Sequence, residues 1–485
     1  MRSKPHSDPP LDLVIVGAGV SGLTIARDVL AARPDWRVLV LERSSHPGGT
    51  MRSDRADGCV CEWGPNGFLT NVPDTWDLAH DLGLASRLRV ADDRAQRRFL
   101  WLAGALREVS TSPLRFLASD MLSVRGKLRL LCEPLMGRRK TPDESIHDFA
   151  RRRIGREAAD VLVDAMVTGI FAGDSHRLSL RAALPRMADM EDRYRSLVRA
   201  MVSIGRERRR TGRAVGGPAG PGGRLVSFDD GMEVLIRRLA DAIGGAMETD
   251  CTVRGVDTVP GGFVVHASGE DGPRAIDARR VVLACPAYVS ATLLHREHPA
   301  LASTLASIPY AGLTVVCLVY DRESIDHDLD GFGFLVPHGQ NVLQLGCLWT
   351  ASIFPDHAPD GRVVLRAMVG GTRDPAGANL PDETLLTRLQ HELGGMLGGI
   401  RGAPRATRIF RHPRAIPQYE LGHPDKLERL SAGLAGVPGL HLAGNAYRGI
   451  GVNDCVREAR RLAGAILSDD VSPAADGDVR AAAEA

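Results

Sequence analysis

The glycine run Gly17–Gly22 constrains the fold of this 485-residue chain more than any other feature. It follows the apolar segment LDLVIV and opens an amphipathic segment, and a second apolar segment, RVLVLE, ends at Glu42, 20 residues after Gly22. This order predicts the strand, glycine turn, helix and strand of a dinucleotide-binding unit. Gly17 permits the tight turn, Gly19 lets the backbone approach a pyrophosphate, and Gly22 lets helix and strand pack closely. The helix N-terminus favours phosphate charge, and Glu42 can bind ribose hydroxyls.

The rest of the chain divides into stretches of different periodicity. From about Arg87 to Arg210 the pattern is helical and dense in arginine, and Thr211–Gly223 is a linker rich in glycine and proline. Near the C-terminus we expect the strand LHLAGN, a helix from Asp454 to Leu467 and a disordered tail after about Asp469. Strands are predicted between these parts, at 261–267, 279–286, 313–321, 331–337 and 364–371.

Composition argues against several classes of protein. The chain is 44% hydrophobic and 25% charged, and its net charge of +2 gives no global reason to bind nucleic acid. No apolar run approaches the roughly 18 residues needed to span a bilayer, and the N-terminus lacks an apolar signal segment, so we expect a cytoplasmic protein. The eight cysteines form no CxxC pair and no His cluster accompanies them, which predicts buried free thiols and no metal site.

A second glycine-rich stretch indicates which dinucleotide is bound. Pro47–Arg52 and Glu62–Gly67 come too soon after Glu42 to be needed for NAD, and they resemble the flavin amine oxidase superfamily. In that superfamily such glycines border the FAD pyrophosphate and isoalloxazine ring, and a separate C-terminal segment closes over the flavin. Gly444–Ala459, GNAYRGIGVNDCVREA, is similar to that segment. Phe228–Leu239 and the strand near Val253 look like its second FAD block.

Within the superfamily the chain resembles the protoporphyrinogen oxidase family. The matching blocks occur in the family's order and span nearly all of 11–468: Arg97–Leu100, Thr168–Asp174, Gly331–Pro337, Ile416–Tyr419 and Tyr447–Cys455. The resemblance implies FAD-dependent removal of six electrons from a porphyrinogen in haem biosynthesis, with hydride passing to flavin N5 and electrons going on to oxygen or a quinone. It also implies a porphyrinogen substrate and allows peripheral membrane contact and a homodimer.

The fold implied by this resemblance is α/β. A Rossmann-like FAD-binding domain is expected from the discontinuous segments 11–88, 224–304 and 436–469, with a β-sheet-based substrate domain at 305–435. A helical, membrane-associating domain is expected at 89–210, followed by the linker 211–223, and 470–485 is the disordered tail. The arginine-rich helices could lie on an anionic membrane, although a solvated charged face is the commoner reason for arginine on helices. Arg206–Arg213 is interpreted as a mobile loop and not a nucleic-acid patch, because no aromatic residues interleave with it.

The resemblance assigns residues to the cofactor and to the substrate. Those expected at FAD are Gly17, Ala18, Gly19, Val20, Ser21, Gly22, Glu42, Arg43, Gly49, Thr50, Gly64, Pro65, Asn66, Gly67, Val253, Gly444, Asn445, Ile450, Gly451 and Val452. Those expected to line the ring pocket are Arg98, Gly169, Phe332, Gly333, Leu335, Leu345 and Met368, with Arg98 pairing with a propionate. Without the family pattern Arg98 would be read as a solvated surface arginine, and Leu345 and Met368 as core. No catalytic side chain is assigned, because no Ser/His/Asp pattern or spaced carboxylate pair occurs and the flavin carries the chemistry.

The triplet Asn453-Asp454-Cys455 resembles a catalytic centre, but we interpret it differently. Asn453 and Asp454 are expected to cap the last helix and to aim its positive end at the flavin, and Cys455 is expected to pack. Gly449 and Gly451, like Gly444, would allow close approach of the backbone to the ring.

Three other functions compete with this interpretation. A coproporphyrinogen oxidase of the same fold would need further cations for two extra carboxylates, and Thr168 stands where some family members carry Arg. An amine oxidase would need a lysine near flavin N5, and no lysine occurs between Lys140 and Lys426. A non-catalytic flavoprotein would not need the pocket blocks.

Overall fold

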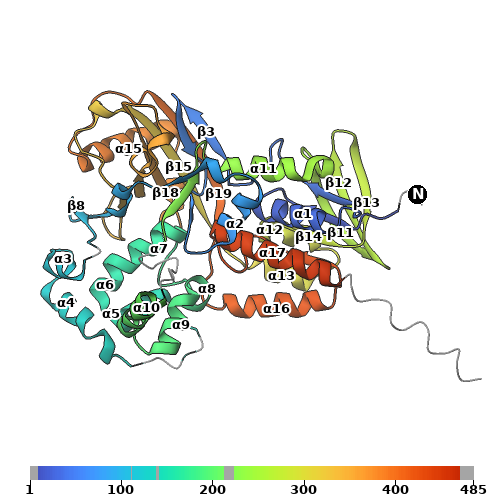
Figure 1. Ribbon diagram of the computed structural model, residues 1–485, viewed down its shortest axis with the longest axis horizontal. Coiled ribbons are helices and arrows are strands. Elements are labelled where there is room, and N and C mark those ends of the chain that lie inside the picture. The colour runs from blue at the N-terminus through green and yellow to red at the C-terminus, as the bar shows by residue number, and fades with distance from the viewer. Residues whose placement is uncertain (1–8, 111, 138–140, 142, 212–222, 470–485) are drawn as a thin grey trace, which may run out of the picture.

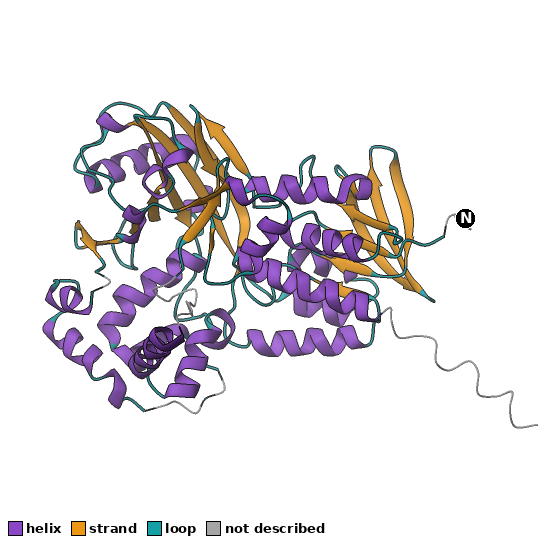
Figure 2. Ribbon diagram, viewed as in Figure 1, coloured by secondary structure: helices purple, strands orange, loops and turns teal. Residues whose placement is uncertain are grey.

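The computed structural model describes residues 9–110, 112–137, 141, 143–211 and 223–469. The predicted linker, apart from its first and last residues, and the predicted tail lie outside these ranges. Two groups of strands and a separate group of helices make up the described chain (Figure 2). The fold is therefore the mixed α/β architecture that the sequence predicts.

A five-stranded parallel sheet holds the dinucleotide-binding unit. In spatial order its strands are β10 (Met247–Glu248), β2 (Val38–Leu41), β1 (Leu13–Val16), β14 (Val281–Leu283) and β20 (Leu440–Leu442). The glycine turn leaves β1 and opens α1 (Val20–Ala32), which confirms the predicted strand, turn, helix and strand. Because β14 and β20 come from distant parts of the sequence, the sheet is discontinuous in the chain.

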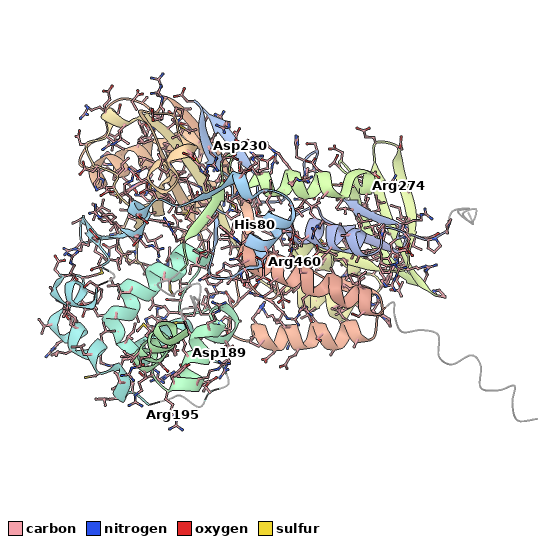
Figure 3. The ribbon with its side chains drawn as sticks, in the orientation of Figure 1. His80, Asp189, Arg195, Asp230, Arg274 and Arg460 are labelled. Atoms are coloured by element: carbon pink, nitrogen blue, oxygen red, sulfur yellow. The ribbon has the colours of Figure 1, made fainter. Side chains whose placement is uncertain are left out.

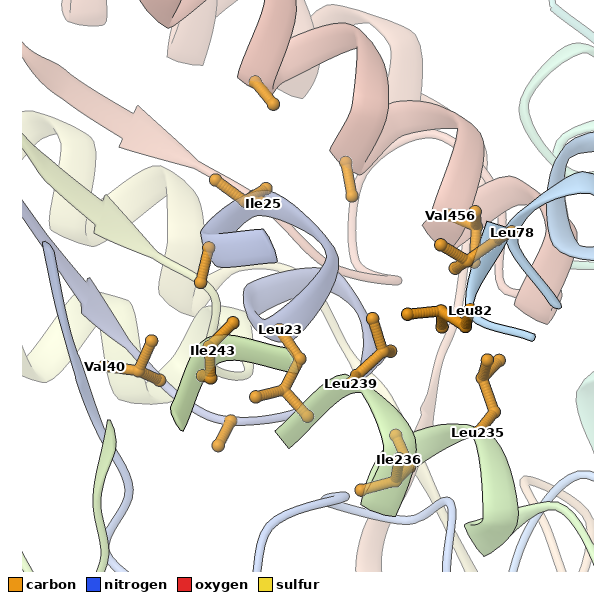
Figure 4. Close-up of a cluster of buried hydrophobic side chains, with 14 of the residues drawn as sticks. Leu23, Ile25, Val40, Leu78, Leu82, Leu235, Ile236, Leu239, Ile243 and Val456 are labelled. Atoms are coloured by element: carbon orange, nitrogen blue, oxygen red, sulfur yellow. The ribbon is translucent and has the colours of Figure 1, made fainter. Parts of the chain in front are cut away.

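Helices cover one face of this sheet. α1 packs with α2 (Asp74–Asp81), α11 (Glu233–Ile243) and α17 (Val452–Asp469) in one buried apolar cluster. Figure 4 shows this core, to which Leu23 of α1, Leu239 of α11 and Val456 of α17 all contribute. Arg460 of α17 pairs with Asp81 at the end of α2 at 2.6 Å, next to His80 in the sequence (Figure 3). The Arg460 Nε also lies 3.8 Å from Asp28 of α1, so α17 is held against both α2 and the helix that the fingerprint opens.

The opposite face packs against an antiparallel sheet and three helices. The strands are β11 (Thr252–Val259), β12 (Gly262–Gly269) and β13 (Gly272–Ala278). The helices are α12 (Ala287–Leu294), α13 (Pro299–Ala306) and α16 (His423–Ala435), which share a second apolar cluster with these strands.

A seven-stranded sheet forms the other strand region (Figure 1). In spatial order its strands are β19 (Ala406–Pro417), β15 (Tyr310–Asp321), β18 (Arg362–Gly370), β17 (Gln344–Trp349), β16 (Gly333–Leu335), β7 (Phe99–Leu102) and β8 (Ala105–Glu108). One face is covered by α15 (Asp382–Met396), whose Leu385, Leu389 and Leu393 are fully buried against it. Smaller sheets join the regions: β3 (Ser53–Ala56) with β4 (Cys59–Glu62), and β5 (Phe68–Leu69) with β9 (Leu225–Phe228) and β6 (Leu88–Val90).

The helical region differs from its prediction at both ends. Its helices are α3 (Pro113–Ala118), α4 (Val124–Leu131), η3 (Glu133–Leu135), α5 (Ile146–Ile154), α6 (Arg156–Ala158), α7 (Asp164–Phe171), α8 (Leu180–Ala183), α9 (Pro185–Tyr194) and α10 (Leu197–Thr211). Residues 99–108, expected to be helical, form β7 and β8, because Phe99–Leu102 pairs with β16 in the larger sheet. Arg206–Thr211, expected to lie in a loop, belongs to α10. A buried ion pair of Arg153 with Glu191 stabilises the group.

Other sequence expectations concern cysteines, metals and membranes. All eight cysteines are free, and six are buried, but Cys132 is exposed and Cys285 partly exposed, so the expectation of buried thiols was wrong for these two. Among the described residues no three His, Cys, Asp or Glu side chains gather as a metal site. No described helix is both long and apolar enough to cross a bilayer.

Candidate flavin site and substrate face

The three fingerprint glycines differ in what surrounds them. Gly17 has φ +108°, and a Cβ there would lie 2.9 Å from the Ala284 carbonyl oxygen; a Cβ at Gly22 would lie 2.0 Å from the Gly17 oxygen. Both positions therefore require glycine for turn geometry or packing. A Cβ at Gly19 would meet nothing within 4 Å. The turn is open at the residue that is predicted to approach the pyrophosphate.

Glu42 lies directly against this turn. It is 8% exposed, and its two carboxylate oxygens accept hydrogen bonds from the backbone N–H groups of Ala18 and Ser44, both at 2.9 Å. The N–H of Cys251 donates to the Glu42 carbonyl at 2.9 Å and thereby brings the start of β11, with Val253, to the same edge. The acidic residue, the glycine turn and the second FAD block are thus brought together.

The second glycine stretch packs beside the first. Gly48 has φ +120°, and its N–H donates to the Ala18 carbonyl at 2.8 Å. A Cβ at Gly49 would lie 3.9 Å from the Gly19 Cα. Nearby, both amide atoms of Asn66 are buried and have no hydrogen-bond partner within the protein. A buried amide of this kind needs a partner, and a bound cofactor with polar edges would provide one.

The C-terminal segment approaches the same place, although not with the predicted caps. α17 begins at Val452, and Gly451 accepts the N–H of Cys455 at 3.0 Å. Asn453 donates its Nδ2 to the Leu69 carbonyl at 2.8 Å, and Asp454 pairs with Arg457 at 2.7 Å. The prediction that Asn453 and Asp454 cap the helix was wrong, because both lie inside its first turn and their side chains are engaged elsewhere.

The glycines and Cys455 of this segment have distinct environments. Gly444 has φ +113° and open space where a Cβ would lie, so backbone can face a ligand there. Burial raises the pKa of the Cys455 thiol to about 12, and Ser21 of the fingerprint helix contacts it. The thiol is neutral at neutral pH and packs, which argues against a nucleophile. Val452 packs in the core of α1, and Ile450 packs against the apolar cluster of the helical region.

The residues of this site fit a flavin dinucleotide. Open glycines at Gly19 and Gly444 face the region from opposite ends of the chain, and the unpaired amide of Asn66 lies within the second glycine stretch. The Asn453 Oδ1 is likewise buried without a partner. FAD would be held by these backbone approaches, and its ring would supply the two-electron acceptor.

Three of the predicted substrate residues, Gly333, Leu335 and Met368, lie on strands of the seven-stranded sheet, on the face opposite α15. Leu335, Gly346 and Met368 are direct neighbours across β16, β17 and β18, and in the next row Gly333 and Leu348 pair. We call these five residues the substrate face. Their sequence neighbours Phe334, Cys347 and Ala367 are buried in the core under α15. Side-chain alternation in the strands therefore separates the two sets.

Three further predicted residues border the substrate face. Gly169 of α7 packs so closely that a Cβ there would lie 2.8 Å from Leu335 Cδ1. Leu345 lies at a register shift between β17 and β18, and its Cδ1 is 3.2 Å from the Cβ position of Gly371. Phe332 precedes β16 and lies under the Arg98 guanidinium, 5.2 Å from ring centroid to Cζ.

Adjacent arginines at the edge of this face have opposite environments. Arg97 pairs with Glu108 at 2.9 Å and also with Asp330. Arg98 is exposed, and its guanidinium makes no ion pair with any carboxylate of the described residues. Arg98 is therefore available to a carboxylate of a ligand.

Arg366, which sequence reasoning missed, joins the substrate face to the flavin site. It is 4% exposed on β18, and its Nε and Nη2 donate to the carbonyls of Glu62 and Gly64 at 3.1 and 2.5 Å. Its position beside Leu348 puts it on the substrate-face side of the sheet. A charged residue inside the apolar run VVLRAMVGG was the available signal, because a buried arginine needs specific acceptors.

The predicted dinucleotide site adjoins the apolar face of a second sheet, an arrangement suited to a flavin-dependent oxidoreductase. The chain belongs to the flavin containing amine oxidoreductase family, whose model matches residues 20–467. FAD is accordingly its cofactor.

Two relatives and one solved structure sharpen the comparison. Over 469 residues the chain is 31% identical to the chloroplastic protoporphyrinogen oxidase of Nicotiana tabacum, covering 93% of this chain and 85% of that protein. It is 27% identical over 473 residues to the coproporphyrinogen III oxidase of Bacillus subtilis, covering 94% and 97%. A crystal structure from Exiguobacterium sp. 255-15, provisionally named a protoporphyrinogen oxidase, matches with TM-score 0.80 at 24% identity, covering 95% and 99%. The resemblance to protoporphyrinogen oxidases is confirmed.

Proposed function

We propose that this protein catalyses the FAD-dependent, six-electron oxidation of protoporphyrinogen IX to protoporphyrin IX in haem biosynthesis. The observation that carries the proposal is the contact of Arg366 with the flavin-site carbonyls of Glu62 and Gly64. This contact places a largely apolar sheet face, of a chemistry suited to a macrocycle, beside the predicted flavin site. Relatives in plants and mammals that carry this activity by name support it.

In this proposal the chain's side chains bind and orient the ring. Leu335, Met368 and Phe332 provide apolar contact, and because Gly169 has no side chain, Leu335 packs directly against the backbone of α7. Arg98 holds one propionate through its planar guanidinium. Bound FAD supplies the electron acceptor, and forming a conjugated macrocycle supplies the driving force, so positioning accounts for most of what the protein contributes. Oxygen or a quinone is the proposed final acceptor.

Coproporphyrinogen III is the alternative substrate, because the relative from Bacillus subtilis is named a coproporphyrinogen III oxidase. Its four carboxylates would need more cations than this face provides. Arg366 is committed to the two carbonyls of the flavin site, and Arg373, which follows the Gly371 that borders Leu345, pairs with Asp164. Arg98 is left as the cation of this region without a carboxylate partner among the described residues, which favours the dicarboxylate.

An amine substrate is disfavoured by the placement of lysine. Within the described ranges the lysines are Lys127 and Lys426, and their ammonium groups donate to the carbonyls of Ser119 and Ser307 at 2.5 and 2.7 Å. Neither acceptor belongs to the flavin site or the substrate face. The chain thus lacks, in the described part, a lysine placed to act beside a flavin on an amine.

We further propose peripheral contact with a membrane through α3, α4 and η3. Val124, Leu128 and Leu131 lie on one face of α4 and are 73%, 58% and 58% exposed, and Leu114 and Leu135 are exposed by 81% and 78%. An apolar face of this kind with exposed Arg115 and Arg125 beside it is suited to an anionic lipid surface. A substrate of low solubility would reach the enzyme from that surface.

The function is tested by loading the purified protein with FAD and adding protoporphyrinogen IX. We expect a flavin absorbance spectrum and fluorescent porphyrin appearing faster than in a flavin-free control, because protoporphyrinogen also oxidises without enzyme. Flavin-loaded protein that gives only the control rate would contradict the proposal and favour a non-catalytic flavoprotein.

A further inference from the structure

Tyr419 makes two hydrogen bonds to the C-terminal segment. Its hydroxyl donates to the Asn445 carbonyl at 2.5 Å and accepts the N–H of Gly449 at 2.9 Å. Asn445 and Gly449 are four residues apart, so a single side-chain oxygen closes the loop between them. Tyr419 itself is buried, at 1% exposed, and both bonds are partly buried.

The ring of Tyr419 is held on several sides. It stacks on His423 of α16 with ring centroids 4.2 Å apart and an angle of 16° between planes, and Phe171 of α7 lies 6.4 Å away. Its carbonyl accepts the N–H of Ser179 at 2.8 Å, and the neighbouring Gln418 donates to the Phe171 carbonyl at 2.9 Å. The hydroxyl therefore has a fixed position set by α7, α8 and α16.

The loop that Tyr419 closes is also held by His423, whose Nε2 bonds to the Tyr447 carbonyl at 3.3 Å, and by Ala446, which is buried in the second apolar cluster. Gly444 and Gly449 have φ values of +113° and +126°. Other residues rarely adopt such values, so the loop is flanked by two flexible positions. The loop leads directly into Gly451 and the N-terminus of α17. Burial raises the pKa of Tyr419 well above its usual value, so the hydroxyl keeps its proton at neutral pH and donates to Asn445.

We propose that Tyr419 is a positioning residue for the flavin: its hydroxyl fixes the 445–449 loop, and through it the backbone at Gly444 and the N-terminus of α17, in the geometry that receives the flavin ring. This role rests on the proposed function, because it assumes that the C-terminal segment closes over FAD. The positive end of α17 then stays close to the ring and stabilises its reduced, anionic form.

The test compares Tyr419→Phe with Tyr320→Phe. The first removes one oxygen and leaves the Asn445 carbonyl and Gly449 N–H unpaired. Tyr320 is equally buried, at 1% exposed, but its hydroxyl has no hydrogen-bond partner, so its removal is a matched control. For Tyr419→Phe we expect about tenfold weaker FAD binding, a more negative flavin midpoint potential and a lower kcat with KM for protoporphyrinogen nearly unchanged. Tyr320→Phe should match the wild type in all four.

The outcomes separate the two proposals. Wild-type protein that binds no FAD would overturn the proposed function and the positioning role together. Wild-type behaviour of Tyr419→Phe in FAD affinity and potential, or a loss of thermal stability alone, would overturn the positioning role only. If Tyr419→Phe does not fold, hydrogen exchange in the full-length wild type before and after FAD addition decides. We expect the Gly449 amide to be protected in both, and exchange at the unprotected rate without FAD would count against the role.

Discussion

Arg366, in the middle of β18, donates its Nη2 to the backbone carbonyl of Gly64 at 2.5 Å. Its Nε donates to the carbonyl of Glu62 at 3.1 Å, so one buried side chain fixes the seven-stranded sheet to the second glycine stretch of the flavin site. The distance between a ring bound on the substrate face and the flavin depends on this connection.

Replacing Arg366 with methionine should therefore be costly. The change leaves two carbonyls unpaired and removes the cation nearest the Glu62 carboxylate, for which we expect a loss of about 3 kcal/mol in the free energy of unfolding. Arg362 lies on the same strand and pairs with Asp57 at 2.7 Å and Asp321 at 2.5 Å, both partly exposed, so Arg362→Met should lose less, about 1 kcal/mol. Urea unfolding of both variants measures the two losses in the free energy of unfolding. Equal losses would show that the Arg366 hydrogen bonds stabilise the fold no more than a surface ion pair does.

Glu62 should make stability depend on pH. Burial raises the pKa of its carboxyl to about 7. Hydrogen bonds from Ser53 and the Met232 N–H, and the charge of Arg366, lower this pKa but do not outweigh burial. Because the folded pKa lies above the unfolded value, the folded state binds more protons between about pH 4.5 and 7. The stabilisation is complete below this window and is lost as pH rises through it, up to roughly 3 kcal/mol by pH 8.

Glu62→Gln should remove this dependence. We expect the variant to gain stability relative to the wild type as pH rises from 5 to 8, measured by urea unfolding at each pH. A constant difference between the two proteins over this range would show that Glu62 titrates at its ordinary pKa in the folded protein.

Arg98→Ala should act on substrate binding. Loss of a propionate contact made equally in the ground and transition states should raise KM for protoporphyrinogen about tenfold and leave kcat nearly unchanged. The neighbouring Arg97→Ala is the control, because Arg97 already pairs with Glu108 and Asp330. Steady-state kinetics of both variants decides, and a KM that moves equally in the two would rule out a specific role for Arg98.

Membrane contact should depend on the exposed face of α4. Leu128→Asp with Leu131→Asp places charge where apolar side chains would enter the lipid, and binding to vesicles of phosphatidylcholine and phosphatidylglycerol should fall more than tenfold in a flotation assay. Val259→Asp, which changes an exposed apolar residue on β11 in the other half of the molecule, should leave binding unchanged (Figure 1). Undiminished flotation of the α4 variant would exclude this face as the contact.

The parts predicted best from sequence were those with a strict local pattern. The Gly17–Gly22 turn combines strand, glycine spacing and helix within a few residues, and each glycine has the predicted kind of environment. Long-range strand pairing has no such local signal. Nothing in the sequence of Phe99–Leu102 indicates that this segment pairs with β16, so the sequence pattern places it in the helical region. Arg366 and Tyr419 act through backbone carbonyls and N–H groups of distant segments, which no spacing rule encodes. The capping prediction failed because α17 begins earlier, at Val452, and the Asn453 and Asp454 side chains bond elsewhere.

The most direct measurement is the ratio of kcat/KM for protoporphyrinogen IX to that for coproporphyrinogen III, determined side by side with the FAD-loaded protein. Two additional carboxylates are costly to place against an apolar face whose described arginines, other than Arg98, are already paired. We therefore predict a ratio of at least about tenfold in favour of protoporphyrinogen IX. A ratio of one or below, with the flavin fully bound, would contradict the account.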